Sequence, residues 1–260
     1  MSKSAQEGPD EASAPAGRCG ADGKLWFLGA GPGAADLLTV RAARALAAAD
    51  VVVWGKALMT DGVVEEHARA DAELVFWPPA EMADIHAVYD RAAQEGLVVA
   101  RLLWGEPSLY GAVRDEVRAA RERGLDYEIV PGVSSLFAAA AALEIELTAA
   151  PQSSRPLILS QGRGDPVPVR ELARHGATIA LFMVGERAAD LQRELIVGGY
   201  DRGARCGIAH RVSWPDDEVV LTCRLDELAA TIAERELDRH TIIIVGPALE
   251  DGGPGISAPS

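Results

Sequence analysis

Cysteine and metal-ligand patterns are what this sequence most clearly lacks. Its three cysteines, Cys19, Cys206 and Cys223, are odd in number, lie far apart and form no Cys-x-x-Cys pair. This arrangement predicts neither a disulfide framework nor a zinc site, and it fits a protein of the reducing cytoplasm. The five histidines show no ligand spacing either, so we expect no bound metal.

Long apolar runs and an excess of positive charge are also missing. Although 48% of the residues are hydrophobic, no stretch reaches the roughly 20 apolar residues that cross a bilayer, so we expect a soluble protein. The 25 Lys and Arg residues are outnumbered by 39 Asp and Glu, which leaves a net charge of -14. This charge disfavours nucleic acid and anionic membranes as partners, and an anionic substrate would need a locally basic pocket.

The chain has the length of two ordinary α/β domains. Residues 1–23 are rich in small and acidic residues and lack the apolar core of a signal peptide, so they are predicted to be a disordered tail. A polar, proline-containing junction near residues 146–155 interrupts the pattern of the remaining chain. We therefore predict an N-terminal domain over 24–146, a C-terminal domain over 147–249 and a flexible tail over 250–260.

Short apolar runs alternate with amphipathic stretches from residue 24 onward. Runs such as Leu97–Leu103, interrupted only by Arg101, are typical of a parallel sheet that helices cover on both faces, which indicates a doubly wound α/β unit. The predicted strands are residues 25–28, 51–54, 73–76, 97–103, 127–130, 157–160, 178–184, 206–210, 219–222 and 241–245. The predicted helices are 39–49, 82–95, 112–123, 138–143, 171–175, 188–195 and 225–234.

The most informative stretch is Leu25–Val40. An apolar strand runs into the glycine-rich turn Gly29–Gly33, and a helix is predicted to begin near residue 35 or 36. The turn approaches the Gly-x-Gly-x-x-Gly nucleotide fingerprint, but its sixth position is Ala34, and Pro32 removes a backbone donor that a phosphate would use. We therefore interpret it as a turn beside a ligand rather than a phosphate-binding loop.

Two further glycine turns have the same layout. Trp104–Gly111 follows the predicted strand that ends at Leu103, and Pro131–Ser135 follows the one that ends at Val130. Open parallel sheets bind ligands in the crevice outside the carboxyl ends of their strands. The three turns are therefore predicted to converge on one ligand site. Ser134 and Ser135 also fit the simpler role of capping a helix.

These motifs, taken in order, resemble the tetrapyrrole methylase family of S-adenosylmethionine-dependent methyltransferases. The residues that carry the resemblance are GAGPGAADLLTVRAARALAAADVVV, ARLLWGEPSLYGA and YEIVPGVSSLFAAAAALEIELT. A more specific similarity, to the precorrin-4 C11-methyltransferase subgroup of corrin biosynthesis, comes from SLYGA, PGVSS, ARHGATIALFM, AHRVSWPDDEVV and RHTIIIVGPAL. The resemblance spans about Leu25 to Leu249.

The resemblance implies a cytoplasmic enzyme of cobalamin biosynthesis, usually a homodimer, with two α/β domains and a cleft between them. The methyl donor S-adenosylmethionine and a tetrapyrrole acceptor would occupy that cleft, with no metal ion from the protein. At positions that match the family's motifs, the donor-binding residues are Pro32, Trp104, Gly105, Glu106, Leu109, Ser134, Ser135, Met183, Val212 and Thr241. The residues expected in the substrate cleft are Gly31, Trp54, Lys56 and Tyr110.

The implied chemistry is transfer of a methyl group from a sulfonium to a nucleophilic carbon, which yields S-adenosylhomocysteine. The protein's part would be alignment and exclusion of water, so no strong catalytic dyad is expected. Glu106 is the candidate for a charge or proton role, because its turn is predicted to face the cleft.

The chain departs from the family pattern at two turns. Trp104, Gly105 and Glu106 stand where the family usually has a small residue, glycine and aspartate, and Trp54–Leu58 replaces a tyrosine-small-glycine-serine-leucine turn. Two alternatives therefore stay open: a methyltransferase of the same fold acting on a different carbon or nitrogen acceptor, such as a secondary metabolite, and a cofactor-binding protein without catalysis.

Overall fold

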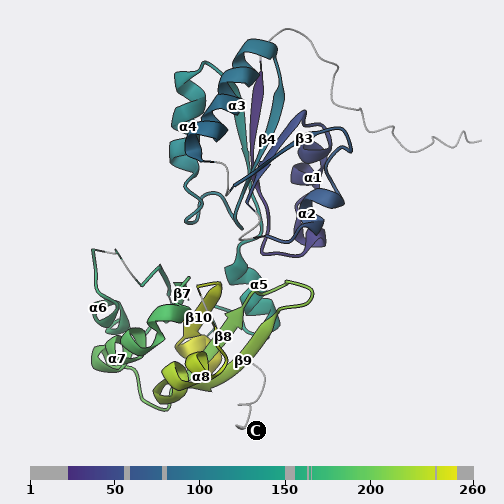
Figure 1. Ribbon diagram of the computed structural model, residues 1–260. Coiled ribbons are helices and arrows are strands. Elements are labelled where there is room, and N and C mark those ends of the chain that lie inside the picture. Colours follow the sequence, from purple (N-terminus) through teal and green to yellow (C-terminus); the bar gives the residue numbers. More distant parts are fainter. Residues whose placement is uncertain are drawn as a thin grey trace, which may run out of the picture.

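Two five-stranded sheets form the frame of the molecule (Figure 1). The computed structural model describes residues 23–55, 59–77, 81–149, 156–162, 164, 166–237 and 239–250. Within these residues the first sheet belongs to the first half of the chain and the second sheet to the second half. The predicted α/β class is confirmed.

The first sheet is entirely parallel and has helices on both faces (Figure 1). Its strands are β1 (Lys24–Gly29), β2 (Val51–Trp54), β3 (Glu73–Phe76), β4 (Val98–Leu103) and β5 (Asp126–Val130), in the order β3-β2-β4-β1-β5. Its helices are α1 (Val40–Ala47), α2 (Gly62–Glu65), α3 (Met82–Glu95) and α4 (Val113–Glu122). One core packs α1 and α2 against the sheet and another packs α3 and α4 against its opposite face. Because the chain reverses its winding direction between β1 and β4, the carboxyl ends of these two strands border the crevice where such sheets bind ligands.

The second sheet is mixed, which the apolar pattern did not reveal. Its elements are β6 (Leu157–Ser160), α6 (Val169–Ala173), β7 (Thr178–Phe182), α7 (Ala188–Gly198), β8 (Arg205–His210), β9 (Val219–Arg224), α8 (Leu228–Glu234) and β10 (Thr241–Val245). In the order β6-β7-β10-β8-β9, only the β6–β7 pair is parallel. A run such as Thr241–Val245 is buried on both faces in either type of sheet, so its composition does not fix the direction of its neighbours.

Helix α5 (Ser135–Ala142) links the two halves of the molecule. It follows β5 directly, but its Leu136 and Ala139 pack against Ala180 and Ile244 of the second sheet. It therefore begins at the edge of the first sheet and covers one face of the second, while α6, α7 and α8 cover the other (Figure 1). The domain limits predicted from the sequence stay predictions.

Of the two starts predicted for the first helix, the one near residue 35 or 36 is wrong and the one at residue 39 agrees with the structure. The structure places a short 3-10 turn at Ala35–Leu37, and α1 begins only at Val40, where the Thr39 hydroxyl accepts a 3.2 Å hydrogen bond from the Ala42 amide. A threonine cap satisfies a backbone donor that the first turn of a helix leaves unpaired, and it marks the helix start more strongly than the apolar pattern. The first glycine turn is thereby lengthened by one short 3-10 turn.

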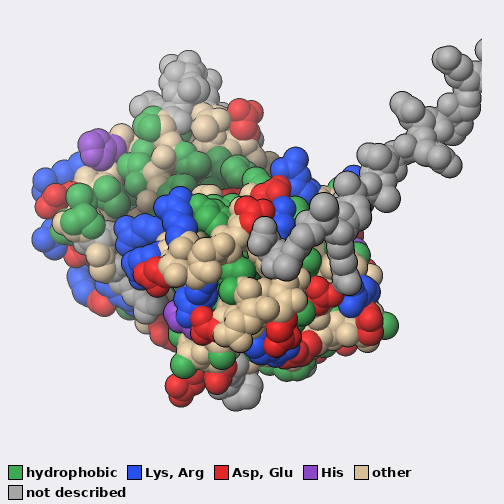
Figure 2. All heavy atoms as spheres, turned by 90° about the horizontal axis from the view of Figure 1, so that it is seen from above, with side chains coloured by type: hydrophobic (Ala, Val, Ile, Leu, Met, Phe, Trp, Pro, Cys, Tyr) green, Lys and Arg blue, Asp and Glu red, His purple; other side chains and the backbone are tan. Residues whose placement is uncertain are grey.

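The surface carries charges of both signs. Figure 2 shows acidic and basic side chains intermixed over the face that it presents. Among the described helices, none is both long and apolar enough to cross a membrane.

A buried ion pair stabilises the contact between α3, β4 and α4. Arg101 Nε donates to Glu116 Oε1 over 3.0 Å, and the Tyr89 hydroxyl donates to Glu116 Oε2 over 2.8 Å. The two charged side chains are only 9% and 5% exposed. Burial and the nearby Glu116 carboxylate raise the pKa of Tyr89, so the phenol keeps its proton and remains a donor. Each charge is therefore compensated by its partner rather than by water.

We expect the Glu116→Ala variant to lose about 3–5 kcal/mol of unfolding free energy, because Arg101 would remain buried without a counter-charge. Tyr89→Phe is the matched control: it removes one hydroxyl donor and should cost only about 1 kcal/mol. Urea denaturation at neutral pH measures both. A loss below about 1 kcal/mol for Glu116→Ala would contradict this account.

Candidate active site

The three glycine turns at the carboxyl ends of β1, β4 and β5 lie against one another. Gly31 and Gly105 exchange two backbone hydrogen bonds, of 3.3 Å from the Gly31 amide and 3.2 Å from the Gly105 amide. A Cβ atom on Gly29 would lie 2.4 Å from the Cα of Gly132, and one on Gly132 would lie 2.1 Å from the Gly105 carbonyl oxygen. Both distances are shorter than atoms tolerate, so these backbones approach only because neither residue has a side chain. The predicted convergence of the three turns is confirmed.

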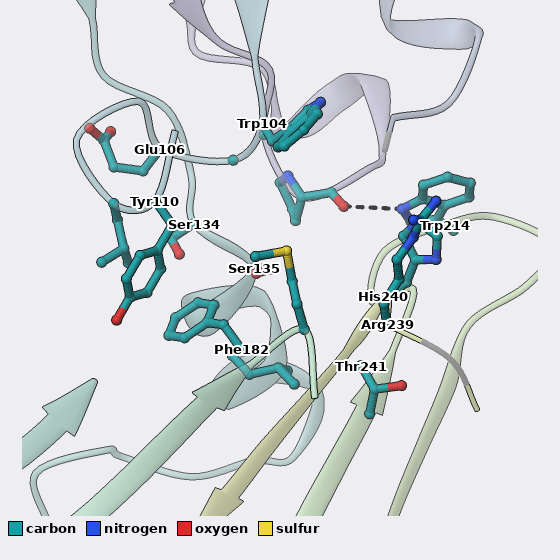
Figure 3. A pocket seen from close by; sticks show the side chains of 16 residues that line it. Trp104, Glu106, Tyr110, Ser134, Ser135, Phe182, Trp214, Arg239, His240 and Thr241 are labelled. Atoms are coloured by element: carbon teal, nitrogen blue, oxygen red, sulfur yellow. Dashed lines mark hydrogen bonds between the residues drawn. The ribbon is translucent and has the colours of Figure 1, made fainter. Parts of the chain in front are cut away.

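A pocket lies between these turns and the ends of β7 and β10 in the second sheet, and we call it the inter-sheet pocket (Figure 3). Its volume is about 130 Å³. Residues from both halves of the chain line it: Gly31, Pro32, Trp104, Gly105, Glu106, Leu109, Tyr110, Ser134, Ser135, Phe182, Met183, Trp214, Arg239, His240, Thr241 and Ile242. The mixture of apolar walls with a few polar and backbone groups is typical of small-molecule sites.

Glu106 connects two of the glycine turns. Its Oε1 accepts a 2.9 Å hydrogen bond from the Ser108 amide, and its Oε2 accepts a 2.8 Å hydrogen bond from the Gly132 amide. In Figure 3 its carboxylate points away from the middle of the inter-sheet pocket. Partial burial raises the pKa of this carboxyl, but the two amides outweigh that effect and hold it below its ordinary value of 4.5. The carboxylate is therefore ionised at neutral pH and braces the turns.

Helix α5 begins at the third turn, beside the pocket. Ser134 is the N-cap of α5, and its hydroxyl accepts a 3.3 Å hydrogen bond from the Leu136 amide, so the capping role is confirmed for Ser134, whereas Ser135 is the first residue of the helix. Both Ser134 and Ser135 nevertheless line the inter-sheet pocket. The backbone amides at the start of α5 carry partial positive charge, which suits a carboxylate or another anionic group of a ligand.

The second sheet contributes the opposite wall. Met183 follows β7 with a φ of 55°, a left-handed conformation that is rare for a residue with a side chain. Thr241, at the start of β10, is joined to the buried His210 by a 3.0 Å hydrogen bond between its hydroxyl and the imidazole Nδ1. The Phe182 ring packs edge-on against Tyr110 with centroids 5.2 Å apart, and thus connects this wall to the second glycine turn.

A loop between β8 and β9, residues 211–218, closes one side of the pocket. In Figure 3 its Trp214 stands beside His240, opposite Tyr110 and Phe182. The Trp214 indole N–H donates to the Pro32 carbonyl over 3.2 Å, which is the dashed line in the figure. This loop therefore links the second sheet directly to the first glycine turn.

A second, larger cavity adjoins the inter-sheet pocket, and we call it the α3–α4 cavity because it lies between the start of α3 and one side of α4. Its volume is about 440 Å³. Trp104 lines both cavities and packs against Trp77, with ring centroids 5.8 Å apart. Gly55 lies next to this pair, since a Cβ there would be 3.5 Å from the indole Nε1 of Trp104. The Trp104 indole thus forms a partition between the two spaces.

Most of the residues predicted to form the site line the inter-sheet pocket. The structure brings together Gly31, Pro32, Trp104, Gly105, Glu106, Leu109, Tyr110, Ser134, Ser135, Met183 and Thr241. Their roles in binding a donor or an acceptor stay predictions.

Two predicted residues of the described chain lie elsewhere. Trp54 is 2% exposed and packs on Phe76, because both faces of β2 are covered by helices, so its side chain belongs to the core and lines neither cavity described above. Val212 is 5% exposed and packs in the core between α5 and the second sheet, behind the pocket wall. Lys56 lies outside the described residues.

The prediction missed five lining residues: Phe182, Trp214, Arg239, His240 and Ile242. Phe182 and Ile242 read as ordinary strand residues, and only the pairing of β7 with β10 brings their strand ends together at the pocket. The other three residues could have been noticed in the sequence, because they are polar or aromatic and flank strands. They are Trp214, which precedes Pro215, and the neighbours Arg239 and His240. Their position next to a strand end could have predicted that these three residues line the site.

Comparison with known proteins gives consistent matches over most of the chain. The family model described as Tetrapyrrole (Corrin/Porphyrin) Methylases matches residues 24–229. The chain is 34% identical over 231 residues to the cobalt-precorrin-4 C(11)-methyltransferase of Methanocaldococcus jannaschii, covering 87% of this chain and 88% of that protein. It is 36% identical over 236 residues to the precorrin-4 C(11)-methyltransferase of Pseudomonas aeruginosa, covering 88% and 92%.

Solved structures of tetrapyrrole methyltransferases are similar to this structure. A cobalt precorrin-4 methyltransferase, described as a cobalamin biosynthetic enzyme, superimposes with a TM-score of 0.81 at 33% identity and covers 87% of this chain and 96% of that one. A uroporphyrin-III C-methyltransferase from Thermus thermophilus, complexed with S-adenosylhomocysteine, superimposes with a TM-score of 0.70 at 29% identity and covers 88% and 94%.

The brace formed by Glu106 predicts a pH-dependent contribution to stability. Because the folded-state pKa is below 4.5, the contribution is fully present above pH 4.5 and is lost as the pH falls through the folded-state value. We expect Glu106→Gln to lower the melting temperature by about 2–4 °C at pH 7, and by progressively less below pH 4.5. Calorimetry of both proteins across pH 3.5–7 measures the difference. A difference that grows towards acid would contradict the assignment.

Proposed function

Because the chain belongs to the tetrapyrrole (corrin/porphyrin) methylase family, we propose that it is an S-adenosylmethionine-dependent methyltransferase acting on a corrin precursor. The acceptor that the similarities favour is precorrin-4 or its cobalt complex, with methylation at C11. A soluble cytoplasmic homodimer, as the family resemblance implies, is part of the proposal.

One observation carries the proposal: the three glycine turns meet the second sheet in a single pocket. That pocket contains eleven of the fourteen residues at positions matching the family's donor and substrate motifs. Its position outside the carboxyl ends of β1, β4 and β5 is where a parallel sheet of this topology binds ligands. Motifs that are up to about 210 residues apart in the chain thus act as one site.

The lining groups fit the chemistry of the methyl donor. The donor's amino-acid end needs hydrogen-bonding groups at close range, and the turn around Gly105 and the start of α5 at Ser134 offer backbone at such a position. Its adenine needs an apolar slot, for which Met183 and Ile242 supply the walls and Thr241 a polar group. The pocket of about 130 Å³ is smaller than the several hundred Å³ of typical ligand sites, so we expect lining side chains to move apart on binding.

The donor, when bound, supplies an electrophilic methyl group, and the protein's residues position and shield it. Glu106 keeps two glycine turns in register through the amides of Ser108 and Gly132, which fixes the wall on which a ligand would be aligned. Its carboxylate is engaged by these two amides, which supports a bracing role over proton transfer. Trp104 and Phe182 supply apolar surface that excludes water.

A second candidate keeps the donor and changes the acceptor. It is favoured by Trp104, which fills the boundary between the inter-sheet pocket and the α3–α4 cavity, where the family resemblance leads us to expect a small residue. A macrocycle with carboxylate arms needs a broad space, whereas a partitioned one suits a smaller acceptor. The choice between acceptors therefore depends on this indole.

We expect the purified protein to bind S-adenosylhomocysteine with a Kd in the micromolar range, about -8 kcal/mol, in isothermal titration. We further expect methyl transfer to precorrin-4 or cobalt-precorrin-4 when the protein is supplied with S-adenosylmethionine. Binding without transfer to either compound would shift the proposal to another acceptor or to a binding protein without catalysis, and the absence of binding would refute it.

Replacement of Trp104 by serine tests the partition. Since the change would join the two cavities, we expect at least a fivefold change in kcat/KM for a tetrapyrrole acceptor. Trp104→Phe keeps most of the bulk and is the matched control, for which wild-type kinetics are expected. Equal kinetics in the serine variant would show that Trp104 does not select the acceptor.

A further inference from the structure

The loop over residues 211–218 is tied to the first glycine turn by two hydrogen bonds from separate residues. The Trp214 indole N–H donates to the Pro32 carbonyl over 3.2 Å, and the Ser213 hydroxyl accepts from the Ala34 amide over 3.1 Å. The partners are 182 and 179 residues apart in the chain. These bonds therefore exist only when the second sheet is docked against the first.

The contact is also tightly packed. A Cβ atom on Gly33 would lie 2.3 Å from Cδ1 of Trp214, so the edge of the indole rests directly on the backbone of the turn. From the other side, the Thr60 hydroxyl donates to the Gly33 carbonyl over 2.6 Å. The ring of Trp214 also lines the inter-sheet pocket beside His240, with ring centroids 6.1 Å apart. The same side chain thus holds the turn and forms a wall of the pocket.

The conformation of the loop is one that needs to be held. Arg211 has a φ of 43° and Ser213 a φ of 68°, both in the left-handed region that residues with side chains rarely adopt. An ion pair between Arg211 and Asp217, and a 2.6 Å hydrogen bond from the Ser213 amide to Glu218 Oε1, fix the loop from within. Such conformations persist where the surroundings impose them, and they concentrate at ligand sites.

We infer that Ser213 and Trp214 are positioning residues for the methyl donor, which hold the loop over residues 211–218 against the first glycine turn and so set the separation of two walls of the inter-sheet pocket. The inference rests on the proposed function and deepens it. If the tie is weakened, only a fraction of the molecules has the Trp214 wall in place, and the apparent Kd for the donor rises by the reciprocal of that fraction.

Two variants test the tie in the full-length protein. Trp214→Phe keeps an aromatic ring but removes the N–H donor, and Ser213→Ala removes the acceptor for Ala34. We expect each to raise the Kd for S-adenosylhomocysteine about 5- to 10-fold in isothermal titration, and the double variant to raise it less than the product of the two, because both bonds hold one contact. Trp26→Phe, a change in β1 away from both cavities, is the matched control and should keep the wild-type Kd.

Hydrogen exchange without any ligand gives a second readout. Because the Ala34 amide is bonded to Ser213, we expect its exchange to accelerate about tenfold in both variants, with no change in Trp26→Phe and with melting temperatures within about 2 °C of wild type. A role limited to general stability would instead lower the melting temperature without this local effect.

The outcomes separate the two proposals. If the wild type does not bind S-adenosylhomocysteine, the proposed function is wrong and this inference falls with it. If the wild type binds and both variants bind equally well, or if exchange at Ala34 is unchanged, the inference alone is wrong. Should Trp214→Phe fail to fold by circular dichroism, Ser213→Ala, which removes a single oxygen from a loop, decides the matter.

Discussion

The contact of glycine on glycine at the ends of β1, β4 and β5 is the constraint on which the rest of the site depends. Gly29, Gly105 and Gly132 lie so close that a single added carbon at Gly29 or Gly132 would overlap a neighbouring backbone. This contact brings three strand ends together, exposes backbone polar groups on one side, and places the first residues of α5 beside them. The carboxylate of Glu106 then fixes the arrangement by accepting from amides in two turns.

Several residues near this contact have strained backbone conformations. Tyr110, Ala112, Met183, Arg211 and Ser213 all have positive φ values, and each lies in or next to a segment that lines the inter-sheet pocket. Residues with side chains in such conformations cost free energy, which the packing elsewhere in the two sheets must offset. The concentration of strain at one place, on both sides of the junction between the sheets, supports the view that this junction is where a ligand is held.

The contact between the turns and the space beside it depend on different parts of the molecule. The contact between the three turns depends on the glycine backbone at the ends of short strands. The space beyond it depends on side chains, and here Trp104 and Trp77 form an aromatic partition at the boundary of two cavities. Trp104 belongs to the second glycine turn, but its side chain can change without altering the backbone contact between the turns.

The sequence by itself determined the α/β class, the position of every strand to within two residues, and the identity of the turns that meet, since glycine, proline and short apolar runs act locally. The family resemblance that its motifs carry also indicated eleven lining residues. The sequence did not determine the direction of the strands in the second sheet, the burial of Trp54 in the core, or the reach of Trp214 to Pro32. Those features follow from how distant segments pack. The contact between Trp214 and Pro32, which are 182 residues apart, produces no periodic pattern in the sequence of either segment. Only the tertiary structure decided them, because the energy that fixes such a contact exists only once both sheets are in place.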